Sequence, residues 1–305
     1  MTLLSEVKSL GHLVECIAHY NRALDEKERG LSKVDISRAF FDGLNKLQTE
    51  WTIHHRDLET GELKRFQLMI LHGLQTDDRT SFLRSDALRV LASLKPQIMN
   101  HDTLRRHGYR PDIEVDIHLA RKASEEHRKL ATAYLELERS MSHETEVCLI
   151  KRAAELLYIV RSNIAHGEKT PYGPDLAKRD RDEQVCTVIV PLQEQLFEFL
   201  LDKPSTKLVS YGTLSPGQLN HELIADVQGT WEECLIRGDV CSIGGLTVFS
   251  WNPAGQEEKA QLFISAELPA AWSRIDTFEG SRYKRRLIPI RTRAGISVAN
   301  VYVGI

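Results

Sequence analysis

Apolar residues recur three and four positions apart over the first two hundred residues, which is the spacing of one buried face of an α-helix. Few Gly or Pro residues interrupt this pattern, and strand-like alternation is rare. Six or seven helices are predicted here. One is expected to begin at Thr76 or Asp77, where a short polar side chain can accept hydrogen bonds from the first turn, and to end before Pro96.

Two further helices are predicted near the end of this region. One covers about 144–165 and follows Ser142, a suitable N-cap residue. The other covers about 181–201, and Pro191 is expected to kink or divide it, because proline removes a backbone hydrogen bond and clashes with the preceding turn. Residues 1–201 are therefore predicted to form an all-helical domain.

The pattern changes at a short polar linker, residues 202–206. After it come short alternating segments rich in β-branched and aromatic residues, which predict strands: KLVSYGTL, GLTVFSW, AQLFISA, RRLIPIR and SVANVYV. One helix is predicted among them, from PAAWSRIDTFEG, where Pro269 suits the first turn. We therefore predict a second domain of α+β type over residues 207–305, separable from the helical domain at the linker.

Charge gives no indication of a nucleic-acid footprint. The net charge is −3 at pH 7, and the last hundred residues contribute ten basic and ten acidic side chains, so the excess of −3 belongs to the first 205 residues. A domain that binds nucleic acid is usually strongly basic. The crowding of Arg and Lys after residue 281 is read as the solvated face of a strand.

The remaining composition favours a cytoplasmic protein. Charged residues interrupt the first twenty positions, which predicts neither a signal peptide nor a membrane span. The five cysteines are odd in number and widely spaced, without a C-x-x-C pair, so they are expected to be reduced thiols. The histidines lack the spacing of a zinc site.

Two motifs about sixty residues apart indicate a candidate active site in the second domain: YGTLSPG over 211–217 and IDTFEG over 275–280. Together with the Tyr283, Arg285 and VANVYVG that follow, they resemble the γ-glutamylcyclotransferase-like superfamily over residues 207–305. The resemblance implies a small β-barrel with flanking helices that releases 5-oxoproline from γ-glutamyl compounds. Ile275 replaces the usual Leu, and residues 231–255 fit loosely, which leaves the substrate open.

The resemblance assigns Glu279 as the catalytic general base and acid, and it places substrate at Tyr211, Gly212, Thr213, Leu214 and Tyr283. Such chemistry needs a carboxylate, because an α-ammonium group must lose a proton before it can attack a carbonyl. A glycine turn allows close approach of backbone N–H groups, which can hold a carboxylate or an oxyanion. Neither a cofactor nor a metal is required.

A second motif lies at the end of the helix predicted over 144–165. The segment from Arg161 to Gly167, RSNIAHG, resembles the R-x4-6-H motif of HEPN domains, which implies dimerisation, RNA binding or metal-independent RNA cleavage by Arg161 and His166. Ser162 stands where that family often has Asn, Asp or His. The alternative is structural: Arg161 pairs with a nearby acid such as Glu155 or Glu168, and His166 caps the helix.

Three readings of the whole chain follow. The first is an enzyme that releases 5-oxoproline from a small γ-glutamyl amine or peptide, joined to a HEPN-like helical bundle that forms a homodimer or binds RNA. The second is a ligand sensor whose barrel has lost turnover. The third is a HEPN-type ribonuclease of a toxin–antitoxin or defence system, with the barrel as its regulator.

Overall fold

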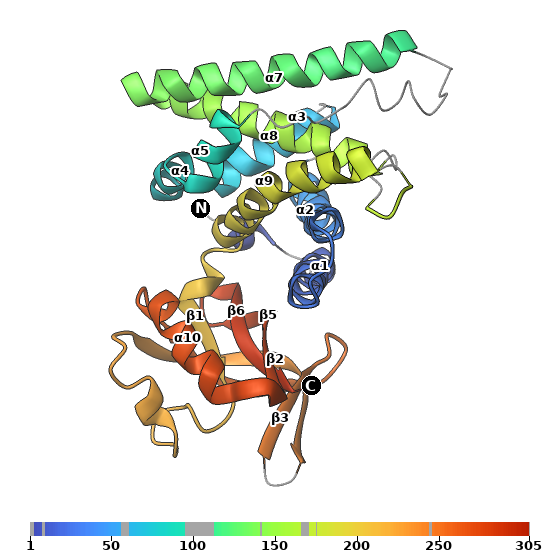
Figure 1. Cartoon of the computed structure of the whole chain (residues 1–305). Helices are drawn as coiled ribbons and strands as arrows, with labels where there is room; N and C mark the ends of the chain where they lie inside the picture. Colours follow the sequence, from blue (N-terminus) through green and yellow to red (C-terminus); the bar gives the residue numbers. More distant parts are fainter. Residues whose placement is uncertain are drawn as a thin grey trace. The chain divides into compact units, whose positions relative to one another are not determined.

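The computed structural model describes residues 3–7, 10–55, 61–94, 113–140, 142–165, 171–174, 176–243 and 246–304. It has a helical region followed by a small mixed β-barrel, as the sequence predicts (Figure 1). Contacts divide the chain into a helical unit, Arg22–Phe199, and a barrel unit made of Thr2–Asn21 and Leu200–Ile305. The helical domain was expected to begin at residue 1, whereas residues 2–21 group with the barrel.

The helices described in the first two hundred residues vary widely in length. They are the short 3-10 helix η1 (Leu3–Glu6) and the α-helices α1 (Leu10–Glu28), α2 (Lys33–His54), α3 (Glu62–Gly73), α4 (Thr76–Leu83), α5 (Asp86–Ser93), α7 (Ile113–Arg139), α8 (His143–Ala165) and α9 (Leu176–Leu200). Ser142 accepts a hydrogen bond from Thr145 N at 3.2 Å, which confirms it at the start of α8.

Two expectations about these helices are wrong. The single helix predicted from Thr76 is divided into α4 and α5, because Ser85 caps a new helix by accepting a hydrogen bond from Leu88 N at 3.2 Å. Pro191 was expected to kink or divide the helix, and the expected division is wrong, because α9 continues from Leu176 to Leu200. Pro191 lies on the exposed side of α9, where solvent can satisfy the carbonyl that loses its partner.

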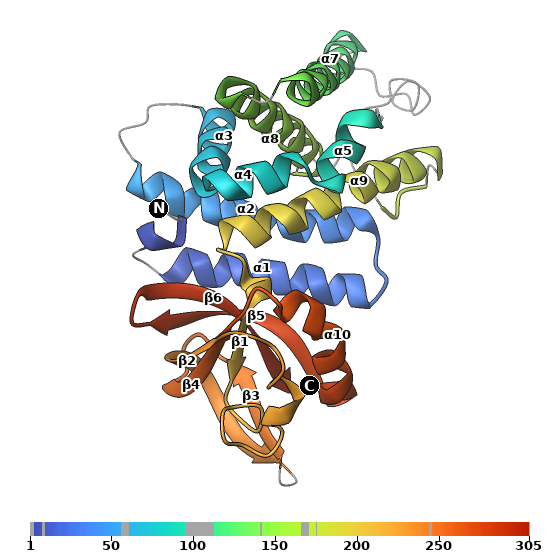
Figure 2. The same cartoon turned by 90° about the vertical axis from the view of Figure 1, so that its left-hand side faces the viewer.

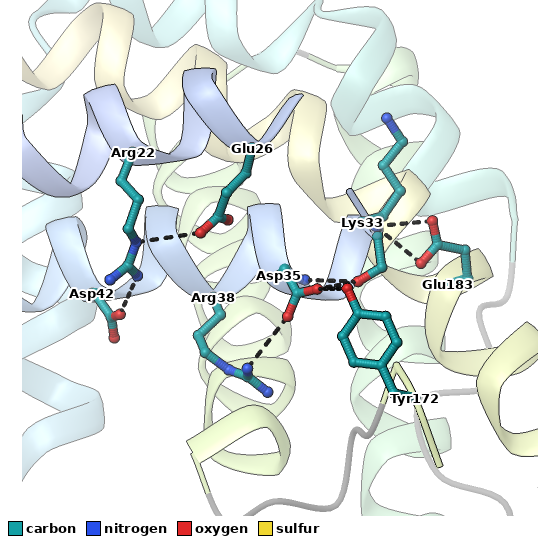
Figure 3. Close-up of polar contacts among 9 residues, drawn as sticks. Arg22, Glu26, Lys33, Asp35, Arg38, Asp42, Tyr172 and Glu183 are labelled. Carbon is teal, nitrogen blue, oxygen red and sulfur yellow. Dashed lines mark hydrogen bonds and ion pairs between the residues drawn. The ribbon is translucent and has the colours of Figure 1, made fainter. Parts of the chain in front are cut away.

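Polar side chains fix the first turn of α2 in the helical unit (Figure 3). Ser32 accepts a hydrogen bond from Asp35 N at 3.1 Å, and both carboxylate oxygens of Glu183 accept from Lys33 N at 2.9 Å. Tyr172 donates its hydroxyl proton to Asp35 at 2.9 Å. Ser32 and Glu183 satisfy two N–H groups at the start of the helix, and Tyr172 holds the Asp35 side chain. Side chains from α9 and from the loop before α9 therefore hold α2 in place.

The barrel unit contains six strands: β1 (Lys207–Ser210), β2 (Thr230–Ile243), β3 (Leu246–Trp251), β4 (Glu257–Ile264), β5 (Tyr283–Thr292) and β6 (Gly295–Gly304). Their order is β3-β2-β4-β1-β6-β5, and a pairing of β2 with β5 closes the sheet on itself. The β1–β6 pair is parallel and the others are antiparallel. All five predicted strand segments and the predicted helix, α10 (Leu268–Glu279), are present.

The hydrophobic pattern did not predict β2, the longest of the described strands. Its apolar positions are separated by Glu232, Glu233 and Arg237 and followed by Gly238, so the alternation is obscured. Pairing with β3 and β4 on its two sides stabilises the strand instead. A Cβ atom at Gly238 would overlap the ring of Phe249, so this position needs glycine for close packing.

The barrel unit has two apolar clusters, one on each face of the sheet. One includes Val209, Ile236 and Phe249. The other joins the sheet to α10, whose Trp272 and Ile275 are buried against strand residues. This second cluster holds α10 against the sheet (Figure 1). Glu279 is the last residue of α10.

The N-terminal half of α1 belongs to the same unit and lies along the end of the barrel (Figure 2). Asn21 donates a hydrogen bond to Leu287 O at 2.8 Å and accepts one from Leu287 N at 2.9 Å. The amide therefore satisfies both backbone groups of one β5 residue, as a neighbouring strand would. None of the helices in the described parts of the chain is long and apolar enough to cross a membrane.

Candidate functional site

The residues that the motifs single out in the barrel unit meet at one cavity of about 130 Å³. Strand β1 ends at Ser210 on its wall, and the turn 211–214 continues from there. Glu279, at the end of α10, and Tyr283, at the start of β5, complete the predicted set. Gly280 has φ of 65°, which lets the chain leave α10 and enter β5 within a few residues, so both side chains reach the cavity.

Glu279 is the one carboxylate among the described residues that line this cavity. Its side chain is partly buried, and burial raises its pKa from 4.5 to about 7. Desolvation penalises the charged form of a carboxylate, so the proton is held more tightly than in water. A carboxyl group with this pKa exchanges a proton readily near neutral pH, as a general base and acid must.

The residues of the turn 211–214 line the same cavity. Its carbonyl groups are used within the loop: Gly212 O accepts from Ser215 N at 3.2 Å, Thr213 O from Asn220 N at 3.0 Å, and Leu214 O from His221 Nδ1 at 3.0 Å. Among the hydrogen bonds of the described residues, none is donated by the N–H groups of 212, 213 or 214. Successive free N–H groups of this kind form a site for an anionic oxygen.

Three tyrosines wall the cavity. The Tyr211 hydroxyl donates to Tyr302 O at 2.7 Å, and the Tyr283 hydroxyl donates to Thr247 O at 3.1 Å. Burial raises the pKa of both phenols, and for Tyr283 the charge of Glu279 adds to the effect. Both hydroxyl groups therefore stay protonated at neutral pH and brace the cavity wall.

Behind the wall, Asp276 connects α10 to β5 and β6. It accepts from the Tyr302 hydroxyl at 2.6 Å and from Arg285 Nε and Nη2 at 3.0 and 3.1 Å. The Arg285 guanidinium also lies over the Trp272 ring, 4.3 Å from its centroid. The positive charge of Arg285 therefore offsets the negative charge of Asp276. Among the described residues that line the cavity, hydrogen-bond donors for an anion are neutral groups.

Four residues of the cavity were not selected from the sequence: Val209, Ser210, Thr247 and Tyr302. Val209 and Ser210 immediately precede the first motif, and Tyr302 lies within VANVYVG. All three belong to predicted strands, and this position in the sequence could have indicated them. Thr247 has no motif around it and reaches the cavity through the pairing of β3 with β2. Among the described lining residues Glu279 alone has a side chain that commonly binds metals, so no cluster of metal ligands is present.

The HEPN-like motif is only partly described, because His166, Gly167 and Glu168 lie outside the described residues. Arg161, in the penultimate turn of α8, is largely buried and pairs with Glu62 of α3 at 3.5 Å. Its guanidinium lies 5.1 Å from the centroid of the Tyr158 ring. Arg161 therefore has an acidic partner, as the structural alternative expects, although the acid is Glu62 rather than Glu155, which pairs with Arg152 at 3.2 Å.

Comparison with known proteins does not identify a family for this chain. No protein-family model and no curated protein matches this chain. A crystal structure of YkqA from Bacillus subtilis is similar over 32% of this chain and 35% of that one, with 23% identity and a TM-score of 0.29. The match spans about a third of that protein, and nothing in the comparisons supports the HEPN resemblance.

Proposed function

We propose that the barrel unit cyclises a γ-glutamyl amine or peptide, releasing 5-oxoproline and the free amine, with Glu279 as the residue that moves the proton. The observation that supports this most is the partly buried Glu279, with its pKa of about 7, in the same cavity as the free N–H groups of 212–214. A proton acceptor and a set of oxygen-binding donors are the two parts that this cyclisation needs.

The reaction forms one carbon–nitrogen bond and breaks another within the same carbonyl group. Glu279 accepts a proton from the substrate's α-ammonium group, and the resulting amine attacks the γ-carbonyl carbon. Glu279 then returns the proton to the nitrogen of the departing amine as that bond breaks. The nitrogen of the new ring loses one of its two remaining hydrogens as a proton to Glu279, which passes it to the free amine, so the products are 5-oxoproline and an ammonium ion and Glu279 is again a carboxylate. Because attacking and attacked groups belong to one molecule, holding the glutamyl chain in a folded shape supplies much of the rate.

The anionic oxygens of the substrate have partners in the turn. In this proposal the N–H groups of 212–214 hold the α-carboxylate or the oxyanion that develops on the γ-carbonyl, since no Lys or Arg is among the described lining residues. The cavity, at about 130 Å³, is well below the roughly 300–1,000 Å³ typical of sites for drug-sized ligands. We expect it to enclose the glutamyl part and leave the departing amine outside.

The test is to incubate the full chain with γ-glutamyl dipeptides and γ-glutamyl alkylamines and to measure 5-oxoproline by chromatography. The α-glutamyl isomers serve as control substrates, because their peptide bond is not on the γ-carbonyl. Glu279→Gln should lose release, since an amide cannot accept the proton, whereas Glu222→Gln, at an exposed position of the same unit, should keep it.

Absence of release from every γ-glutamyl compound would make the enzymatic proposal wrong and favour the ligand-sensing reading. Release that is unchanged in Glu279→Gln would support the activity and exclude Glu279 as its base.

A further inference from the structure

The barrel unit contains a second cavity, of about 250 Å³, which shares no lining residue with the cavity of Glu279. Its walls come from the first turns of α1, from β2, β4, β5 and β6, and from the end of β3. Most of the lining is apolar and is contributed by Leu10, Gly11, Val14, Leu235, Trp251, Pro253, Pro289, Ile290 and Ile296. An apolar cavity with few polar groups is the usual form of a small-molecule site.

The strand pairings explain why this cavity forms at one end of the barrel. Leu235 of β2 pairs with Arg291 of β5 at the position where the sheet closes. Arg291 in turn pairs with Ile296 at the start of β6. The β5–β6 hairpin turns just beyond this pairing, between Thr292 and Gly295, and Leu10 and Val14 of α1 also line the cavity.

The three charged lining residues carry one positive charge in excess. Arg237 Nη2 lies 3.3 Å from Glu257 Oε1, and Arg291 Nη2 lies 3.2 Å from the same oxygen. Two guanidinium groups therefore share a single carboxylate oxygen. All three side chains are partly exposed, between 31% and 52%, so they stand where the cavity meets solvent.

We infer that this cavity is a binding site for a small amphipathic carboxylate, with the apolar part among the aliphatic residues and the carboxylate between Arg237 and Arg291. The apolar lining excludes a strongly polar ligand, since burying unpaired polar groups costs free energy. The excess positive charge selects an anion, and a guanidinium suits a carboxylate because it offers parallel N–H donors. The volume, just below the range for drug-sized ligands, limits the apolar part to a short chain or a single ring.

Octanoate is a suitable probe, and octanol and octylamine are matched controls with a neutral and a positive head group. Binding to the full chain is measured by calorimetry below the micelle-forming concentration. Trp251 is the one tryptophan among the described lining residues, so its fluorescence gives a second signal. Octanoate should bind at least about threefold more tightly than octanol, and octylamine should bind most weakly.

Substitutions of Arg291 and Glu257 should change the affinity for octanoate in opposite directions. Arg291→Gln should weaken octanoate about two- to fivefold, the range for a partly exposed ion pair, and should leave octanol unchanged. Glu257→Gln removes the competing carboxylate and should strengthen octanoate by a similar factor. Arg293→Gln, at an exposed position outside the cavity, is the control and should change nothing.

The inference is wrong if octanoate and octanol bind equally, or if neither produces heat or a fluorescence change. It is also wrong if Glu257→Gln weakens octanoate as Arg291→Gln does, because a purely structural ion pair would be lost in both variants. Val14→Phe, which fills the cavity, should abolish binding of octanoate and octanol alike, and binding that survives it would place the site elsewhere.

Discussion

Replacing Glu279 by Gln should stabilise the barrel unit by an amount that grows as pH rises from about 4.5 to about 7. Burial raises the pKa of Glu279 to about 7, against 4.5 for an ordinary glutamate. Between these pH values the folded chain keeps a proton that the unfolded chain releases, so the free energy of unfolding falls as pH rises. Above pH 7 the loss is complete, and below about pH 4.5 it is absent.

The size of the effect follows from the two pKa values. Their difference of about 2.5 corresponds to about 3.4 kcal/mol, at about 1.36 kcal/mol per pKa unit. Solvent reaches part of the Glu279 side chain and screens its charge, which reduces the expected value to about 1–2 kcal/mol. Glutamine has nearly the same shape and no charge, so Glu279→Gln should gain this amount between about pH 5 and about pH 8.

The assay is urea unfolding of both proteins at about pH 5 and about pH 8, followed by tryptophan fluorescence. Three of the four tryptophans, Trp231, Trp251 and Trp272, belong to the barrel unit, so the signal reports mainly on it. Glu222→Gln, at an exposed position of the same unit, is the control. A stability difference for Glu279→Gln that is the same at both pH values would refute the reasoning, and so would a loss of stability at about pH 8.

Three further predictions follow from the barrel unit and from α8. The rate of 5-oxoproline release by the wild type should rise with pH through about 7 and then level off, because the base must be ionised; a rate that falls through this range would exclude Glu279. Gly238→Ala should destabilise the barrel unit by about 1–3 kcal/mol in urea unfolding, because its Cβ would overlap Phe249, and an unchanged midpoint would contradict that packing. If the third reading holds, RNA cleavage should survive EDTA and vanish in both Arg161→Ala and His166→Ala; cleavage that persists in both would show that the motif is a chance match.

Much of the barrel unit could be predicted because its signals are local. Alternating β-branched residues marked five strands, and Pro269 with the apolar spacing marked α10. β2 was missed because charged residues interrupt it and because its strand structure depends on partners far away in the sequence. The division at Ser85 was missed because one serine side chain decides it, within a pattern that otherwise continues as helix.

Most of the residues that line the candidate site could also be predicted from the sequence. The two motifs and the Tyr283 that follows them identified Tyr211–Leu214, Glu279 and Tyr283, and the structure brings all of them to one cavity, although their roles stay predictions. Thr247 could not be selected, since no motif surrounds it, whereas Tyr302 lies within VANVYVG and was not singled out there. The partner of Arg161 is Glu62 of α3, about a hundred positions earlier, and no spacing rule connects two residues on different helices.

The grouping of residues 2–21 with the barrel has a consequence for how the chain is made. The helical unit is continuous from Arg22 to Phe199, so its contacts can form as soon as that segment has been synthesised. The barrel unit draws on both sides of this segment, and Asn21 meets Leu287 only after 266 positions. During synthesis the first turns of α1 are therefore made long before β5, which they contact in the folded chain. The contacts of α1 with β5 are among the last that the chain can form.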